Sequence, residues 1–360
     1  MSPSFRALRV DSLREYRWLI AVWAVVALFA LVTALWSIHV GVPLRDPRGV
    51  IFQRRVLWAL ALFGLLIVVD ASMRAGIRPW TVAKTAAELR RRWPTDRLVV
   101  ALTGLFAYHI VYVCYRNLKS WDAFNRPRDG DLLRLDSWLF LGHSPAALLH
   151  DLLGQGLAAH ILAAIYVSFT HLVPLAFVSG LVFADRIRDG YVFLMSAMWV
   201  WILGTASYYL IPTLGPFASA QHVFDGLAHT AITAGQVDYL ARRAYMLQNP
   251  QADNAFASIS AFASLHVAFT FMVLLMLRYF GLRRAARLLG VYLVGVIIAT
   301  IYFGWHFVTD DVAGLALAYL AVLFARLMMY PRGRPDSAQQ APDVIEGSLR
   351  HETETGASGV

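Results

Sequence analysis

Charged residues are scarce in this chain of 360 residues: 15% are Asp, Glu, Lys or Arg, whereas 58% are hydrophobic. So large an apolar share excludes a soluble domain of this size and indicates a polytopic membrane protein. Cysteine is nearly absent, and because Cys114 stands alone an intrachain disulfide is excluded. No repeat of fixed period is visible. No group of carboxylates, histidines or cysteines has the spacing of metal ligands, so we expect no metal and no other cofactor.

The excess of basic residues, +9 in net charge, gathers at the ends of apolar runs. It forms no groove interleaved with aromatic residues, so the pattern indicates anionic lipid headgroups and no nucleic acid as partners. The densest basic stretch, 74–97, marks the cytoplasmic side of the membrane. Just before it, Asp70 stands four residues from Arg74, and we expect these two side chains to pair.

The apolar runs predict an all-α fold, a polytopic membrane helical bundle of about eight spans, because a helix needs about 20 apolar residues to cross a bilayer. The first run lacks a small-residue cleavage site and is too long for a signal peptide, so we interpret it as a retained span. An even number of spans places both termini on the same side, and the basic stretch 74–97 marks that side as cytoplasmic. The predicted spans are 18–40, 56–73, 98–115, 158–183, 191–211, 262–280, 287–304 and 311–330.

The link after the first span conflicts with this orientation. It carries Arg45, Arg48, Arg54 and Arg55, which would lie outside, whereas basic residues favour the cytoplasmic side. The orientation of the first two spans therefore stays open, and the prediction for the last six does not depend on it.

Composition divides the chain into three parts. Residues 1–97 form a basic leader and two accessory spans, and residues 98–330 form a six-span core. Within the core, 116–157 is expected to lie along the outer interface, and the loop 212–261 is long enough to cap an external site. From 331 to 360, Pro, Gly, Ser, Gln and Glu replace the apolar runs, which predicts a disordered tail.

The strongest functional signal is a pair of histidines near the last three spans. His306 and Asp310 stand four residues apart, so on a helix the carboxylate can bond one ring nitrogen and prepare the other as a nucleophile or base. His266 lies about 40 positions earlier, which is two membrane crossings, so both histidines emerge on the same face. By spacing alone the pair could be merely solvated. Its position at a membrane helix end favours chemistry, because ionisable groups there are costly unless they face a polar cavity.

A third polar motif follows the third span and reaches the same face. It consists of Lys119 and, seven residues later, Arg126 followed by Pro127. A lysine supplies a point charge and an arginine a rigid fork of donors, a combination that holds a phosphate through several oxygens. The alternative interpretation is a basic pair that anchors an interfacial segment to lipid headgroups.

Together and in this order, the three motifs resemble those of the type 2 phosphatidic acid phosphatase superfamily, over residues 116–330. The family pattern is Lys-x6-Arg-Pro, then Pro-Ser-Gly-His, then Ser-Arg-x5-His-x3-Asp. The first motif is matched in full, and the second and third in part. Matching positions are Lys119, Arg126, Pro127, Ser264, His266, His306 and Asp310.

Four positions depart from the family pattern. Ala263 and Leu265 replace Pro and Gly, and Ala299 and Thr300 replace Ser and Arg, which removes one phosphate-holding cation. The Ser-Leu-His motif looks closer to the branch that includes inositol phosphorylceramide synthases. The segments 302–306 and 311–314 and the Pro-Thr-Leu-Gly-Pro turn at 212–216 are also similar to that branch.

The resemblance implies a six-helix phosphatase-type core and a role for each matching residue. His306 would attack phosphorus and form a phosphohistidine, oriented by Asp310. His266 would protonate the leaving oxygen and then deprotonate the incoming water or alcohol. Phosphoryl oxygens would be bound by Lys119, Arg126 and Ser264.

We therefore expect an integral-membrane lipid phosphatase or phosphotransferase of the cell envelope. It would act at the outer leaflet of the plasma membrane on a lipid phosphate or phospholipid. The acceptor is water in hydrolysis and a polyol or lipid alcohol in transfer. Two other classes stay open: a lipid or solute transporter, whose polar residues would line a pathway, and a noncatalytic membrane protein that binds lipid phosphate.

Overall fold

A computed structural model describes residues 16–76 and 80–333 of the chain. The predicted basic leader and the predicted disordered tail therefore lie almost entirely outside the described residues. The compact unit considered below ends at Met329.

The described residues form helices and contain no strand, which confirms the all-α class. Among the described residues, seven helices are long and apolar enough to cross a membrane, so the chain is a multi-pass membrane protein. The α-helices are α2 (Trp18–Val40), α3 (Gln53–Arg74), α4 (Val82–Arg92), α5 (Thr95–Trp121), α6 (Asp129–Leu139), α7 (Pro145–Leu153), α8 (Leu157–Phe183), α9 (Ile187–Leu210), α10 (Pro216–Ser219), α11 (Ala231–Gln248), α12 (Leu265–Tyr279), α13 (Arg283–Tyr302) and α14 (Val308–Met329). Three short 3-10 helices are η1 (Pro47–Gly49), η2 (Asp122–Phe124) and η3 (Gln221–Val223).

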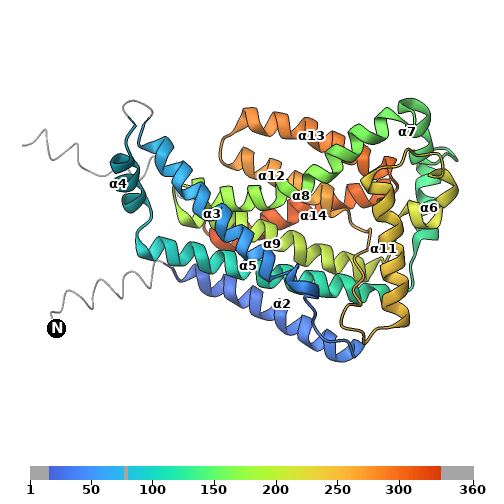
Figure 1. Cartoon of the computed structure of the whole chain (residues 1–360), viewed down its shortest axis with the longest axis horizontal. Helices are drawn as coiled ribbons and strands as arrows, with labels where there is room; N and C mark the ends of the chain where they lie inside the picture. The colour runs from blue at the N-terminus through green and yellow to red at the C-terminus, as the bar shows by residue number, and fades with distance from the viewer. Residues whose placement is uncertain (1–15, 77–79, 334–360) are drawn as a thin grey trace, which may run out of the picture. The chain divides into compact units, whose positions relative to one another are not determined.

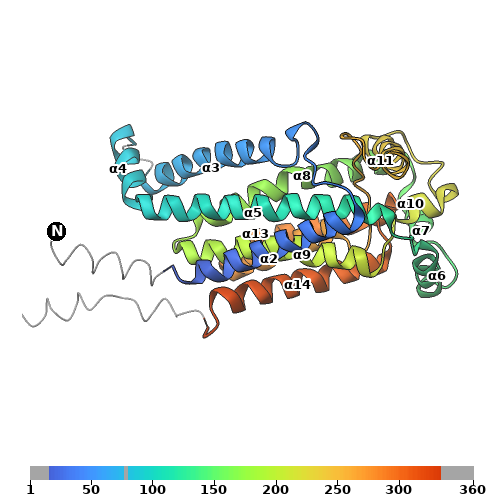
Figure 2. The same ribbon diagram turned by 90° about the horizontal axis from the view of Figure 1, so that it is seen from below.

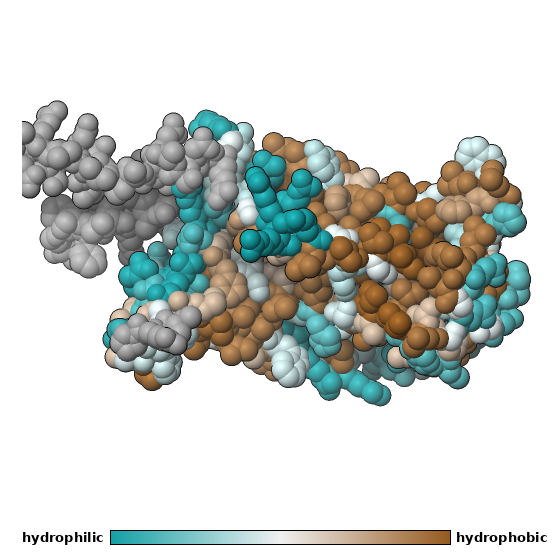
Figure 3. Space-filling model, turned by 90° about the horizontal axis from the view of Figure 1, so that it is seen from above, coloured by the Kyte–Doolittle hydropathy of each residue, from teal (hydrophilic) through white to brown (hydrophobic). Residues whose placement is uncertain are grey.

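The long helices lie side by side and alternate in direction (Figures 1 and 2). α9 occupies the centre of the bundle, where α5, α8, α12 and α14 pack around it. Its side chains are correspondingly apolar on all sides, as a helix needs when it is buried by neighbours. Figure 3 shows a broad apolar area on one face, with hydrophilic side chains at both ends and in patches between them.

One end of the bundle, which we call the basic end, is defined by Arg74, Arg92 and Arg97. The Arg74 Nε lies 2.8 Å from Asp70 Oδ1, so the predicted pairing of these residues is confirmed. Arg92 bonds the other oxygen of Asp70 at 2.5 Å and also lies 3.4 Å from Asp185. These contacts join α3, α4 and the turn between α8 and α9.

The sixth predicted span, 262–280, is only partly helical, because α12 has 15 residues and begins at Leu265. The preceding residues from 249 to 263 enter the bundle without helical structure, and partners elsewhere satisfy their backbone. Arg45 donates to the carbonyls of Ala255 and Pro250, at 3.0 and 2.8 Å. The Ala261 N–H donates to the Thr213 carbonyl at 2.8 Å. Non-helical backbone at membrane depth requires such partners, since lipid supplies none.

Two other segments differ from the sequence-based expectation. α5 continues past 115 to Trp121, so the first residues assigned to the interfacial segment extend the third span instead. The loop 212–261 contains α11, whose first turn is closed by reciprocal hydrogen bonds between Thr230 and Thr233. This capping box uses Thr at a position where Glu or Gln is the usual sequence signal.

The crossing of α12 and α14 requires a glycine. A Cβ on Gly314 would lie 2.5 Å from the backbone oxygen of Ser264, which cannot move without displacing the start of α12. We expect Gly314→Ala to lower the free energy of unfolding by about 2 kcal/mol, because overpacking against rigid neighbours costs about 1–3 kcal/mol. Thermal unfolding in detergent measures the change.

The matched control is Gly64→Ala in the middle of α3, where nothing lies within 4 Å of the added Cβ. Alanine has the higher helix propensity, so this variant should be at least as stable as the parent. Equal unfolding midpoints for the two variants would contradict the close-packing argument.

Candidate active site

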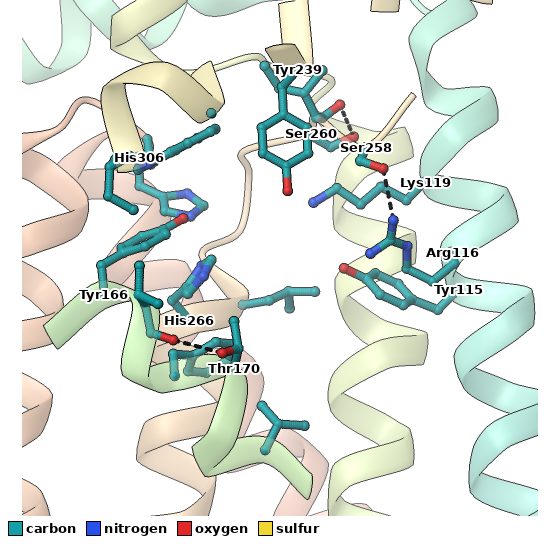
Figure 4. A pocket seen from close by; sticks show the side chains of 18 of the residues that line it. Tyr115, Arg116, Lys119, Tyr166, Thr170, Tyr239, Ser258, Ser260, His266 and His306 are labelled. Atoms are coloured by element: carbon teal, nitrogen blue, oxygen red, sulfur yellow. Dashed lines mark hydrogen bonds between the residues drawn. The ribbon is translucent and has the colours of Figure 1, made fainter. Parts of the chain in front are cut away.

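A cavity of about 480 Å³ lies at the end of the bundle opposite the basic end. Lys119, His266 and His306, three of the residues predicted for the site, line it from different elements (Figure 4). α11 covers the cavity with one face. The other polar and aromatic side chains on its wall include Arg55, Tyr112, Tyr115, Arg116, Tyr166, Thr170, Trp201, Tyr208, Asp238, Tyr239, Ser258, Ser260 and Trp305.

His306 lies in the short connection between α13 and α14. Gly304, with φ of +65°, ends α13 in the left-handed conformation and turns the chain so that His306 faces the cavity. Asp310 lies behind it, fully buried, and its Oδ2 is 3.3 Å from His306 Nδ1 and accepts from the Phe307 N–H at 3.0 Å. With Nδ1 donating to the carboxylate, Nε2 carries the lone pair.

The protonation state of His306 suits a nucleophile. Burial holds the pKa of its imidazole well below the usual range, and the nearby His266 and Lys119 act in the same direction. A hydrogen bond to the backbone of Ala261 acts in the opposite direction, and the net effect favours the neutral ring.

His266 stands in the first turn of α12. Its ring centre lies 5.9 Å from that of His306 and 4.3 Å from that of Tyr166, on which it stacks. Phe169 contacts the ring from α8 at 4.4 Å. These aromatic contacts hold the two imidazole rings far enough apart for one small group to fit between them.

Lys119 reaches the cavity from the last turn of α5, with its Nζ 5.0 Å from the centre of the Tyr208 ring. Two further cations line the cavity that the sequence motifs did not indicate: Arg116, one turn earlier on α5, and Arg55 on α3. The only signal for Arg116 was its position three residues before Lys119, which places both on one helix face. Arg55 comes from a span predicted to be accessory.

Two other predicted site residues lie elsewhere. Arg126 is exposed and is not part of the cavity wall. Ser264 is fully buried as the N-cap of α12, where its hydroxyl accepts from the Val267 N–H at 3.5 Å. Its own N–H donates to the Asp310 carbonyl at 3.0 Å. The structure thus brings together Lys119, His266, His306 and Asp310, and gives Ser264 a position beneath the site.

α6 holds the two loops that shape the cavity. Asp129 accepts from the N–H groups of Leu214 and Gly215, at 3.0 and 2.8 Å. Asp136 accepts from the Val308 N–H at 2.9 Å and so caps the first turn of α14, just after His306. Burial raises the pKa of both carboxyls, and these backbone hydrogen bonds oppose the rise.

The Pro-Thr-Leu-Gly-Pro turn contacts the His306 loop directly. The Phe217 N–H donates to the Gly304 carbonyl at 2.9 Å, and a Cβ on Gly215 would lie 2.6 Å from the Trp305 carbonyl oxygen. Behind the loop, the Thr300 hydroxyl donates to Asp311 Oδ2 at 2.9 Å. Within residues 16–76 and 80–333, no three His, Cys, Asp or Glu side chains are placed to hold a metal ion.

A family model described as the PAP2 superfamily matches residues 130–324, more than half of the chain. The chain belongs to the PAP2 superfamily. The matched region includes both histidines and Asp310, and it begins after Lys119 and Arg126. Neither the curated proteins nor the solved structures compared with the chain gave a match.

Membership of the PAP2 superfamily and the seven apolar helices fit a membrane lipid phosphatase. The match identifies the superfamily but not the inositol phosphorylceramide synthase-like branch that the sequence resembles. It also leaves α2, α3 and α5 outside, although α3 and α5 supply the three cations of the cavity.

The cap on α14 can be tested by removing one carboxylate. We expect Asp136→Ala to lower the free energy of unfolding by about 1–3 kcal/mol, because the partly buried Val308 N–H would lose its acceptor. Asp131→Ala, on the same helix but half-exposed and paired with the exposed Arg128 and Arg134, should change it by less than about 0.5 kcal/mol. Thermal unfolding of both variants in detergent compares them. Equal losses would show that Asp136 has no special role in holding the His306 loop.

Proposed function

We propose that this PAP2 superfamily protein is a lipid phosphatase or phosphotransferase that works through a phosphohistidine on His306. The observation that carries the proposal is the facing arrangement of the His306–Asp310 pair, His266 and Lys119 around one cavity. A neutral imidazole oriented by a carboxylate is an activated nucleophile, and a second imidazole opposite it is placed for proton transfer.

In the first step, the His306 Nε2 lone pair forms a bond to phosphorus while the bond from phosphorus to the leaving oxygen breaks. His266 gives that oxygen a proton. Asp310 stabilises the positive charge that develops on the His306 ring, and Lys119 binds the phosphoryl oxygens as their charge redistributes.

In the second step, the neutral His266 takes a proton from an incoming hydroxyl, whose oxygen attacks phosphorus as the bond to His306 breaks. Water as the acceptor gives a phosphatase, and a polyol or lipid alcohol gives a transferase. The Ser-Leu-His motif and the Pro-Thr-Leu-Gly-Pro turn favour the inositol phosphorylceramide synthase-like branch, and with it the transfer of a phospho-headgroup.

The test of this function is product analysis with purified protein and a panel of lipid phosphates, lipid diphosphates and phospholipids, with and without inositol or glycerol. We expect His306→Ala to lower turnover by at least about a thousandfold, because removing a catalytic nucleophile leaves only binding and charge stabilisation. His222→Ala is the control, since His222 is an exposed residue of η3 outside the cavity wall.

Free phosphate that disappears in His306→Ala would identify a hydrolase, and a phosphodiester formed only with added alcohol would identify a transferase. Undiminished turnover in His306→Ala would overturn the mechanism. Lipid flux into proteoliposomes that persists in the same variant would favour a transporter.

We further propose that the cavity opens toward the outer leaflet of the plasma membrane, with both termini cytoplasmic. The basic end lies opposite the cavity, and basic loops favour the cytoplasmic side. In a Cys114→Ala background, we expect a membrane-impermeant maleimide to label Leu141→Cys in intact cells but Arg90→Cys only after permeabilisation. Both positions are exposed, at opposite ends of the bundle. The reverse labelling pattern would place the cavity on the cytoplasmic side.

A further inference from the structure

The wall of the cavity formed by α5 and α3 carries three basic side chains, of which the proposed mechanism uses only Lys119. Arg116 lies one turn before Lys119 on the same face of α5. Arg55 comes from α3, and its Cζ lies 4.5 Å from the centre of the Tyr112 ring, one further turn along α5. The α5 positions that carry or contact these cations, from Tyr112 to Lys119, therefore span about two helical turns, or about 11 Å.

The carboxylate of Asp122 acts electrostatically on Lys119 from one turn further along the chain, and it is hydrogen-bonded to Ser260 and Asn125. Within the described parts of the chain, no ion pair includes Lys119, Arg116 or Arg55. Asp238 is the acidic residue among those on the wall, and its carboxylate is bonded to Arg242 at 2.7 Å. Arg55 is exposed and Arg116 and Lys119 are half-buried, so a ligand can reach all three. Like charges grouped on one wall repel one another, and an anionic ligand would offset that repulsion.

Arg116 is oriented by neutral groups. Its Nη2 donates to the Ser258 hydroxyl at 2.8 Å, and its Cζ lies 5.6 Å from the centre of the Phe256 ring. Its buried Nε has no hydrogen-bond partner within the described residues. In Figure 4 the guanidinium lies beside Tyr115 on the wall that faces His266 and His306. The Arg116 side chain is thus held in place, and its remaining N–H groups can donate to a ligand.

One phosphoryl group cannot account for the whole row. Hydrogen bonds to a phosphate oxygen reach only about 3 Å, whereas the Lys119 head lies over the Tyr208 ring of α9 and the Arg55 head over the Tyr112 ring of α5. A phosphate monoester carries a charge of about −1.5 to −2 near neutral pH, which leaves part of the charge of three cations uncompensated. A second phosphate next to the first would match both the length of the row and its charge.

We propose that Arg55 and Arg116 form a second anion subsite beside the phosphoryl subsite at Lys119, and that it binds a second phosphate group. The assignment of the first subsite rests on the proposed function. The second phosphate has two possible sources with the same chemistry: the lipid-linked phosphate of a lipid diphosphate, whose distal phosphate His306 attacks, or a phosphate carried by a polyol acceptor.

Binding can be measured without turnover by comparing inorganic phosphate with methylenediphosphonate, a diphosphate analogue that is not hydrolysed. We expect the full-length protein to bind methylenediphosphonate at least about tenfold more tightly, since charge-assisted hydrogen bonds to arginine are strong. Arg55→Gln and Arg116→Gln should each remove most of this preference and leave phosphate affinity within about twofold. Lys119→Gln should lower the affinity for both phosphate and methylenediphosphonate.

Arg54→Gln is the matched control, because Arg54 precedes Arg55 on α3, is exposed and is not part of the cavity wall. If Arg116→Gln does not fold, Arg116→Lys keeps the charge but loses the fork, and it should retain only part of the preference. Equal affinities for the two ligands in the parent protein, or an unchanged preference in the Arg55 and Arg116 variants, would overturn the proposal.

Turnover then distinguishes the two sources. A preference for lipid diphosphate over lipid monophosphate with the same tail, lost in Arg55→Gln, assigns the second phosphate to the lipid. A preference for inositol phosphate over inositol, lost in the same variant, assigns it to the acceptor. An active enzyme with neither preference would overturn the subsite. Inactive protein that still prefers methylenediphosphonate would retain the subsite and refute the proposed function.

Discussion

The hydrogen bond from the Ser264 N–H to the Asp310 carbonyl joins the starts of α12 and α14, and the placement of both histidines depends on it. Both segments leave helical structure inside the bundle, where lipid cannot satisfy a backbone donor or acceptor. Other parts of the chain supply these partners: Thr213 accepts from the 261–262 segment, and Asp136 accepts from α14. The need to satisfy the backbone thus fixes the relative positions of the groups that carry the chemistry.

Charge is used differently at the two ends of the bundle. At the basic end, Arg74 and Arg92 pair with Asp70, so these charges connect helices. At the cavity end, Arg55 and Arg116 pair with no carboxylate among the described residues and line a space for a ligand instead. This difference also explains the basic link after the first span, which conflicted with the charge rule for membrane orientation. Two of its arginines are retained by partners at the cavity end: one bonds the carbonyls of the 250–255 segment, and the other lies over an aromatic ring.

Much of the fold could be predicted from the sequence because apolar runs of membrane-spanning length have few alternatives to the helix. The end of α5 was placed too early, since Lys119 and its neighbours look polar in the sequence, although in the structure they face a cavity rather than solvent. α11 was missed because its 18 residues have little apolar periodicity and its cap uses an unusual residue. For the site, the four-residue spacing predicted the contact between His306 and Asp310, because that contact is local. Arg126 was expected at the phosphate, yet it lies exposed beyond the end of the helix.

The sequence by itself determined the membrane class, the order of the spans and the return of His266 and His306 to one face, since each follows from segment lengths and local periodicity. Only the tertiary structure decided which cations reach the cavity. Arg55 and Arg116 are separated along the chain by a complete span and its loops, and they share one wall because α3 packs on α5 and α8. Such a contact depends on how helices pack against each other, which the residues of a single segment do not encode.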